Sequence, residues 1–139
     1  MTEYVSEGKT ILYSDTDVYR VLSDLRKLAS VSDLMPENRL SDFSFDENRV
    51  SFRLDPIGKV TFFVEEREPN RMVKFKSEKL PFDVFLWIQL VAKAEKDTLL
   101  RLTVRADLNP FLSGMVQKPM HEMMDKISDA LSQLPYDRL

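Results

Sequence analysis

The chain has 139 residues, a formal net charge of -3 at pH 7, no cysteine and one histidine. This length suits a single domain over residues 1–139 that buries enough apolar surface to fold without a metal or a disulfide. The charge gives no general attraction to nucleic acid, and the missing cysteines exclude disulfides, thiolate catalysis and cysteine-ligated metal.

The N-terminal part predicts a strand followed by short helices. β-favouring residues over 4–13 indicate a first strand that is interrupted near Gly8. The sequence does not fix its inward face, because both alternations mix polar with apolar residues. Ser14 or Asp15 resembles a helix cap before an apolar stripe of Val18, Val21, Leu22, Leu25 and Leu28. We therefore expect one or two short helices before a connection over 30–38.

Residues 39–106 have the pattern of six strands. Apolar and polar residues alternate in runs that are separated by turn residues, and the first two runs flank the turn at 46–48 as a hairpin. Connections this short require antiparallel neighbours. Alternate residues of a strand point to the same face of a sheet, and we call the residues of one such set a parity. The apolar residues that would share one face of this sheet are Phe43, Phe45, Val50, Phe52, Val60, Phe62, Val64, Val73, Phe75, Val84, Leu86, Ile88, Leu90, Leu100, Leu102 and Val104.

The last part predicts a long helix over 109–134. Asn109 can cap its first turn, Pro110 suits the first helical position, and Pro135 ends it. At about 1.5 Å per residue the helix spans roughly 39 Å, so only the strands are broad enough to cover its apolar side. That side consists of Leu108, Phe111, Leu112, Met115, Val116, Met120, Met123, Met124, Ile127, Ala130, Leu131 and Leu134.

Pro119 lies inside this helical pattern, close after Gly114. A proline there removes one main-chain hydrogen bond and clashes with the carbonyl four residues earlier, so we expect a bend or a break over 115–119. A static kink would let the helix follow a curved sheet. A hinge would instead open the mouth of a pocket.

These elements predict an α+β fold. A curved antiparallel sheet of six to seven strands wraps around the long C-terminal helix, with the short helices placed after the first strand. Twisted antiparallel sheets curve, so the sheet cannot touch the helix everywhere. The remaining gap is a candidate pocket.

Two segments carry a family resemblance. The first, ILYSDTDVYRVLSDL over residues 11–25, places Val18, Tyr19 and Leu22 in a "V-aromatic-x-x-Leu" helix. The second is TLLRLTVRADL over 98–108, followed by NPFLSGMVQKPMHEMMDKISDAL. On these residues the chain resembles the START-like, or SRPBCC, superfamily, which includes Bet v 1 relatives and polyketide-cyclase-like proteins. It departs from them at residues 14–16, Ser-Asp-Thr, where many relatives carry an Ala-Pro pair.

The resemblance implies a helix-grip fold over nearly the whole sequence. It also implies a cavity between sheet and helix that holds lipids, sterols, polyketides or other hydrophobic molecules, in which a minority of the superfamily catalyse reactions. Fold alone does not choose between these uses, so the choice has to come from the site.

Apolar residues that would face each other across this cavity are the candidates for ligand binding. Four of the seven methionines lie on the predicted C-terminal helix, where thioether side chains would form an adaptable wall, although ordinary core filling explains them equally well. The candidates are Phe62, Phe75, Leu86, Ile88, Leu102, Val104, Phe111, Met115, Met120, Met123 and Met124. We expect no catalytic residue, metal or cofactor, because no phosphate-binding glycine loop, nucleophile elbow or metal-ligand spacing occurs.

A second apolar set has the opposite strand parity and would point outward. It consists of Phe63, Phe85, Trp87 and Val91. An aromatic patch on the outer face favours a homodimer or another partner surface, mainly through Phe85 and Trp87. Alternatively, a bulge shifts the register and turns Trp87 into the cavity.

The remaining polar candidates have ordinary explanations. His121 stands beside Glu122 without a nucleophile or an orienting group at a recognisable spacing, so a solvated histidine is favoured over a catalytic one. The charged residues of the first and last strands favour the outer face, where cross-strand ion pairs are expected. They are Glu7, Lys9, Arg101 and Arg105.

The sequence therefore predicts a domain that binds a hydrophobic small molecule or lipid between sheet and helix. An enzyme of cyclase, aromatase or hydrolase type would need an inward polar cluster with a displaced pKa. A protein-interaction module would use the outer aromatic face. No apolar run is long enough to cross a bilayer, and residues 1–8 have no basic segment followed by an apolar signal core, so we expect a cytoplasmic location.

Overall fold

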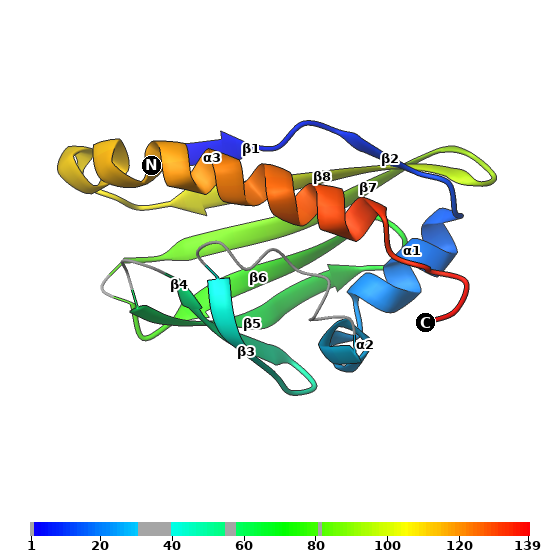
Figure 1. Ribbon diagram of the computed structural model, residues 1–139, viewed down its shortest axis with the longest axis horizontal. Helices are drawn as coiled ribbons and strands as arrows, with labels where there is room; N and C mark the ends of the chain where they lie inside the picture. Colours follow the sequence, from blue (N-terminus) through cyan, green and yellow to red (C-terminus); the bar gives the residue numbers. More distant parts are fainter. Residues whose placement is uncertain (1, 31–39, 55–57, 81) are drawn as a thin grey trace.

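A curved antiparallel sheet lies against a long C-terminal helix, with two short helices at one end (Figure 1). The structure is a computed structural model that describes residues 2–30, 40–54, 58–80 and 82–139. In chain order the elements are β1 (Thr2–Val5), β2 (Lys9–Ile11), α1 (Asp15–Leu22), α2 (Leu25–Ser30), β3 (Leu40–Phe45), β4 (Arg49–Leu54), β5 (Gly58–Glu68), β6 (Met72–Glu78), β7 (Val84–Ala94), β8 (Asp97–Ala106) and α3 (Pro110–Ser132).

The sheet confirms the expected fold class. Among the described residues it has eight strands in the order β1-β8-β7-β6-β5-β4-β3, with β2 also paired to β8, and every pairing is antiparallel. The strands β3 to β8 thus form the predicted meander. The first strand returns to the far edge and pairs with the last, which leaves the sheet open between β1 and β3.

The interruption of the first strand occurs near Gly8, as predicted. A Cβ atom at Gly8 would lie 2.7 Å from Cδ1 of Leu99, so any larger residue there would have to displace the Leu99 side chain. Just before this point, the Ser6 hydroxyl accepts a hydrogen bond from the Leu102 amide at 2.9 Å. The serine hydroxyl therefore accepts a hydrogen bond from a main-chain amide of β8 at the point where the two pieces of the first strand separate.

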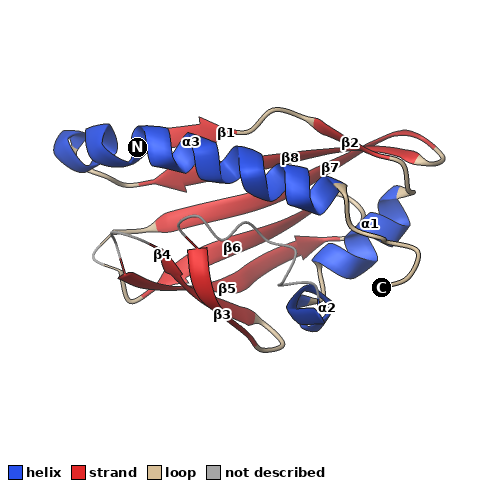
Figure 2. Cartoon of the chain, in the orientation of Figure 1, coloured by secondary structure: helices blue, strands red, loops and turns tan. Residues whose placement is uncertain are grey.

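The inner face of the sheet is formed by the apolar residues that strand alternation predicted for one face. Val60, Val73 and Leu102 are buried there, and in the register of β7 with β8 Ile88 lies opposite Leu102. The helices complete this layer from one side of the sheet (Figure 2). Alternation along the strands thus identified the face that forms the core.

The short helices begin where the sequence indicated. Ser14 is the N-cap of α1, and its hydroxyl accepts a hydrogen bond from the Asp17 amide at 3.2 Å. Val18, Val21 and Leu22 are fully buried. Helices α1 and α2 lie at the end of the molecule opposite the first turns of α3 (Figure 1).

Helix α3 continues through Pro119, so of the expected bend or break the break is wrong, and the bend stays a prediction. A proline leaves the carbonyl of the residue four positions earlier, Met115, without its helical partner. Met115 lies on an exposed part of the helix, where that carbonyl can meet solvent. The described helix ends at Ser132, two residues before the predicted end.

The segment after α3 is tied to the rest of the molecule. Tyr136 is fully buried, and its hydroxyl donates a hydrogen bond to the Leu131 carbonyl in the last turn of α3. The Arg20 guanidinium donates to the Tyr136 carbonyl at 2.9 Å. These bonds connect the C-terminal end of α3 to α1.

Two buried tyrosines give a matched test of this connection. The Tyr136 hydroxyl is hydrogen-bonded, whereas the Tyr4 hydroxyl is buried without a partner among the described residues. We expect Tyr136→Phe to lower the free energy of unfolding by about 1–2 kcal/mol, and Tyr4→Phe to leave it unchanged or raise it slightly. Urea unfolding at neutral pH measures both, and equal losses in the two variants would contradict this account.

The contribution of Tyr136 to stability should depend on pH. Burial raises the pKa of Tyr136 in the folded protein, whereas in the unfolded chain the phenol ionises near its usual value of about 10. The neutral phenol therefore contributes its full stability below about pH 10 and loses that contribution as the pH rises further. The stability advantage of the wild type over Tyr136→Phe should shrink above about pH 10, measured by urea unfolding across that range.

Candidate functional site

Two adjoining chambers lie between the inner face of the sheet and the helices. Each has a cavity volume of about 110 Å³. Six residues line both chambers, which therefore adjoin, and we call the boundary that these residues form the passage: Phe52, Phe62, Leu86, Ile88, Ile127 and Leu131.

The first chamber, which we call the phenylalanine chamber, lies toward α2 and the strands β3 to β6. Its further lining residues are Leu25, Leu28, Phe43, Phe45, Val50 and Phe75. The Phe43 and Phe45 rings are stacked with centroids 6.0 Å apart and planes 8° apart. Phe52 continues the row, 5.6 Å from Phe43 and 6.0 Å from Phe62. Aromatic rings thus form a continuous wall.

The second chamber, which we call the methionine chamber, lies under the second half of α3. Its further lining residues are Val84, Leu102, Val104, Met120, Met123 and Met124. The valines and the leucine come from β7 and β8, and the methionines come from α3. Met124 is buried, while Met120 and Met123 are half-buried. This wall combines stiff branched side chains with flexible thioethers.

No charged or polar side chain lines either chamber as the structure describes it. Nearby buried hydroxyls are already engaged: Ser77 accepts a hydrogen bond from the Val84 amide, and Ser128 donates to the Asp125 carbonyl, both at 3.0 Å. The buried Tyr4 hydroxyl has no partner among the described residues, but Tyr4 does not line a chamber. The described lining can therefore bury apolar groups of a guest, and it supplies no charged partner to them.

Most of the predicted ligand-binding residues meet at these chambers. Nine of the eleven are lining residues among the part of the chain that the structure describes: Phe62, Phe75, Leu86, Ile88, Leu102, Val104, Met120, Met123 and Met124. Their role in ligand binding stays a prediction.

Phe111 and Met115 do not line either chamber. They are 75% and 54% exposed, because each stands nine residues, or two and a half helical turns, before a chamber-lining methionine, Met120 or Met124, and therefore projects from the opposite side of α3. The three- and four-residue steps of the apolar pattern drift around the helix between Met115 and Met120, so the assignment of these two residues to the inward side was wrong. The expectation that these two residues face the sheet is therefore corrected.

Sequence reasoning left out about half of the lining. The residues it missed are Leu25, Leu28, Phe43, Phe45, Val50, Phe52, Val84, Ile127 and Leu131. Their signal was present, since the strand residues share the inward parity and the others belong to the apolar stripes of the helices. What the sequence lacked was the curvature that brings β3 and β4 back toward α2.

Phe85 and Trp87 lie on the outer face, on the opposite side of β7 from Leu86 and Ile88. The only register shift between β7 and β8 over their described pairing is at residues 92–94, well away from Trp87. The alternative in which a bulge turns Trp87 inward is therefore wrong.

Cationic side chains cover these two aromatic rings. The Lys74 ammonium lies 4.9 Å from the Phe85 ring centroid and 5.3 Å from that of Trp87. The Arg105 guanidinium lies 5.5 Å from the Trp87 ring, and Lys76 lies 5.7 Å from the Phe85 ring. Both aromatic side chains are consequently half-buried, and the outer face alternates cations with aromatic rings.

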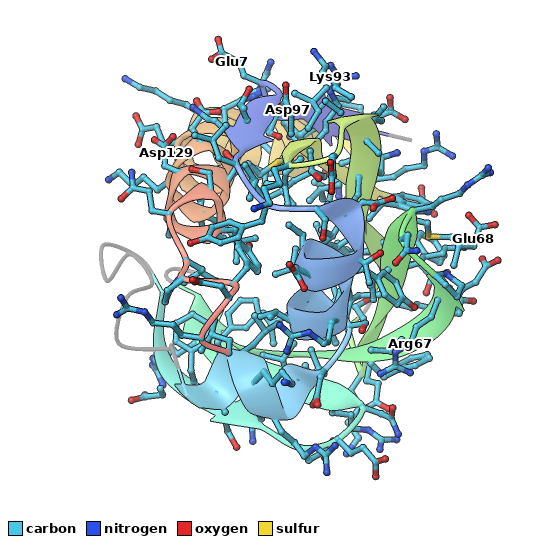
Figure 3. All side chains as sticks on the ribbon, turned by 90° about the vertical axis from the view of Figure 1, so that its right-hand side faces the viewer. Glu7, Arg67, Glu68, Lys93, Asp97 and Asp129 are labelled. Carbon is cyan, nitrogen blue, oxygen red and sulfur yellow. The ribbon has the colours of Figure 1, made fainter. Side chains whose placement is uncertain are left out.

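The charged residues of the first and last strands follow their expectation in part. Arg105 forms the expected cross-strand pair with Glu3, at 2.6 Å. Lys9 instead lies on the helix side and pairs with Asp129 at 2.8 Å, a contact that raises the pKa of Lys9. The expectation for Lys9 was wrong because residues on the face of Ile11 point toward α3. Glu7 points outward, as Figure 3 shows.

Other kinds of site find little support in the described residues. His121 is exposed and contacts the Tyr4 ring edge-on, with ring centroids 5.0 Å apart. Residues 2–30, 40–54, 58–80 and 82–139 contain no group of three or more histidine, aspartate or glutamate side chains placed to hold a metal ion. No described helix is both long enough and apolar enough to cross a membrane.

Comparison with known proteins finds solved structures with a similar fold. No protein-family model matches the sequence, and no curated protein matches it. Norcoclaurine synthase from Thalictrum flavum, in complex with dopamine and hydroxybenzaldehyde, matches with 14% identity over 99% of this chain and 89% of that chain, at a TM-score of 0.70. A START superfamily protein from Mycobacterium smegmatis matches with 13% identity over 94% of each chain, at a TM-score of 0.71.

The chain has the START-like helix-grip fold. The expected resemblance is confirmed at this level. A protein from Thermus thermophilus, TTHA0849, shares the START-like fold too, with 18% identity over 95% of each chain and a TM-score of 0.67. Identities this low show the fold alone, so the function of the two chambers has to be interpreted from their own residues.

Two leucines on one strand test whether the chambers are empty space. Leu102 lines the methionine chamber, whereas Leu100 is fully buried on the same face of β8 and lines neither chamber. We expect Leu102→Phe to change the free energy of unfolding by less than about 1 kcal/mol, because the ring can enter the cavity. Leu100→Phe should cost about 1–3 kcal/mol through overpacking. Urea unfolding of both variants decides this, and a larger loss for Leu102→Phe would contradict the described cavity.

Proposed function

We propose that this protein binds a hydrophobic small molecule or lipid in the two chambers between the sheet and α3. The observation that supports the proposal is that every described lining residue is apolar, around about 110 Å³ of space in each adjoining chamber. Burial of apolar surface is worth about 25 cal/mol per Å², so a guest that fills both chambers gains affinity without any polar contact. The expected cytoplasmic location stays a prediction.

The enzymatic alternative finds no comparable support in the described residues. Norcoclaurine synthase is an enzyme with this fold, so the fold permits catalysis. Acid–base chemistry would require an ionisable side chain that faces the ligand. The described lining supplies aliphatic, aromatic and thioether groups instead.

Two positions on β7 test the binding proposal. Ile88 lines both chambers, and Val91, with 55% of its surface exposed, lies on the outer face of the same strand. A neutral fluorescent probe, N-phenylnaphthylamine, should bind the wild type. Ile88→Phe should weaken that binding at least about tenfold, because the larger ring occupies the passage, while Val91→Phe should leave it unchanged.

Fluorescence titration measures the three affinities, and thermal unfolding checks that both variants are folded. Native mass spectrometry and solvent extraction of freshly purified protein search for a resident guest. A wild type that takes up no apolar probe would contradict the proposal, as would equal weakening by both substitutions.

The outer aromatic face supports a second candidate function, the docking of another copy of this chain. The Phe85 and Trp87 rings lie 5.9 Å apart on one side of the sheet, where aromatic pairs favour interfaces. If this face forms a homodimer, the wild type should sediment as a dimer and Trp87→Ser as a monomer. Sedimentation equilibrium measures both, and monomers in both samples would exclude this homodimer.

A further inference from the structure

We propose that the ligand has two unlike apolar ends, an aromatic ring that occupies the phenylalanine chamber and a saturated chain that occupies the methionine chamber. This inference rests on the proposed function and specifies its ligand class. The two chambers differ in composition, and each is small enough to select one end of such a molecule.

The phenylalanine chamber favours a flat aromatic guest. Of its own lining residues, Phe43, Phe45 and Phe75 are aromatic, and the shared residues add Phe52 and Phe62. Two of the neighbouring ring pairs are stacked within 15° of parallel. An aromatic guest can pair with such rings face to edge or in an offset stack, whereas a saturated guest gains only apolar burial.

The methionine chamber favours a saturated, flexible guest. Among its described lining residues the only aromatic rings are the shared Phe52 and Phe62, against five rings in the phenylalanine chamber, and three of its own residues are the methionines of α3. Unbranched thioether side chains have three rotatable bonds and adjust to guests of irregular shape. Opposite them, Val84, Leu102 and Val104 present a fixed aliphatic surface. An alkyl chain fits this combination better than a rigid plate does.

The small volume of each chamber supports a single ligand that carries both ends. A dry apolar cavity of about 150 Å³ is known to hold benzene, so a chamber of about 110 Å³ suits a single small ring or a short chain. A guest that fills both must extend through the passage of shared residues. Because no described lining residue can pair with a polar group, a hydroxyl on the buried ring would lose its hydrogen bonds with water.

Four probes distinguish the ends of the ligand. They are butylbenzene, butylcyclohexane, para-butylphenol and phenylbutanol. We expect butylbenzene to bind about three- to tenfold more tightly than butylcyclohexane, because only the benzene ring gains the aromatic contacts. Both para-butylphenol and phenylbutanol should bind more weakly than butylbenzene, since each would bury a hydroxyl group at one end. Displacement of N-phenylnaphthylamine measures the four affinities.

Orientation gives an independent readout. In nuclear Overhauser spectra of methyl-labelled protein with butylbenzene, the terminal methyl group of the probe should contact the methionine methyls of residues 123 and 124. Its ring protons should contact the Phe43 and Phe45 rings. Two substitutions serve as a matched pair: Phe43→Leu should remove the preference for butylbenzene over butylcyclohexane, and Met123→Leu should preserve it.

The outcomes separate the two proposals. If the wild type binds none of the probes, the proposed function fails and this inference fails with it. If butylbenzene and butylcyclohexane bind equally, or the butylbenzene ring contacts the methionines, the chambers still bind hydrophobic molecules and only the two-ended ligand is overturned. The expected preference, orientation and variant pattern together support it.

Discussion

One helix has to cover the inner face of a sheet that curves across eight described strands. Side chains can fill such a mismatch only partly, since packing at native density requires facing surfaces of similar shape. Along β7 and β8 the second half of α3 lies close enough for Met124 and Leu131 to be buried. Toward β3 and β4 the distance is spanned by phenylalanines and by α2 instead. The chambers are therefore a result of the architecture, and their two linings reflect which elements reach each part of the sheet.

The sequence predicted the layers of this fold well because alternation and helical periodicity are local signals. The inward parity of Phe62, Phe75 and Ile88 needed no knowledge of the rest of the chain. The cap at Ser14 or Asp15 and the interruption of the first strand near Gly8 were also predicted locally, because caps and strand interruptions depend on the residue type itself. Even the outward direction of Trp87 followed from strand parity.

Properties that depend on long-range geometry were predicted poorly. Phe111 and Phe43 have equally apolar side chains, yet one is exposed and the other lines a chamber, because Phe111 lies on the side of α3 that turns away from the sheet, whereas the sheet curls toward α2 and brings Phe43 to the chamber. Lys9 was placed on the wrong face, since the sequence of the first strand does not show which of its faces meets α3, where Asp129 lies 120 positions further along the chain. The burial of Tyr136 beyond the end of α3 had no periodic signal at all.

The attachment of α3 is unequal along its length. Its C-terminal end is held by Tyr136, Arg20 and the ion pair of Lys9 with Asp129, whereas its N-terminal turns carry exposed Phe111 and Met115 and a hydroxyl contact between Ser113 and Thr2. Local opening costs least where the fewest apolar contacts are lost. Fraying should therefore start at Pro110 and travel toward the methionines, so local opening would uncover the methionine chamber first while the opposite end of the molecule stays folded.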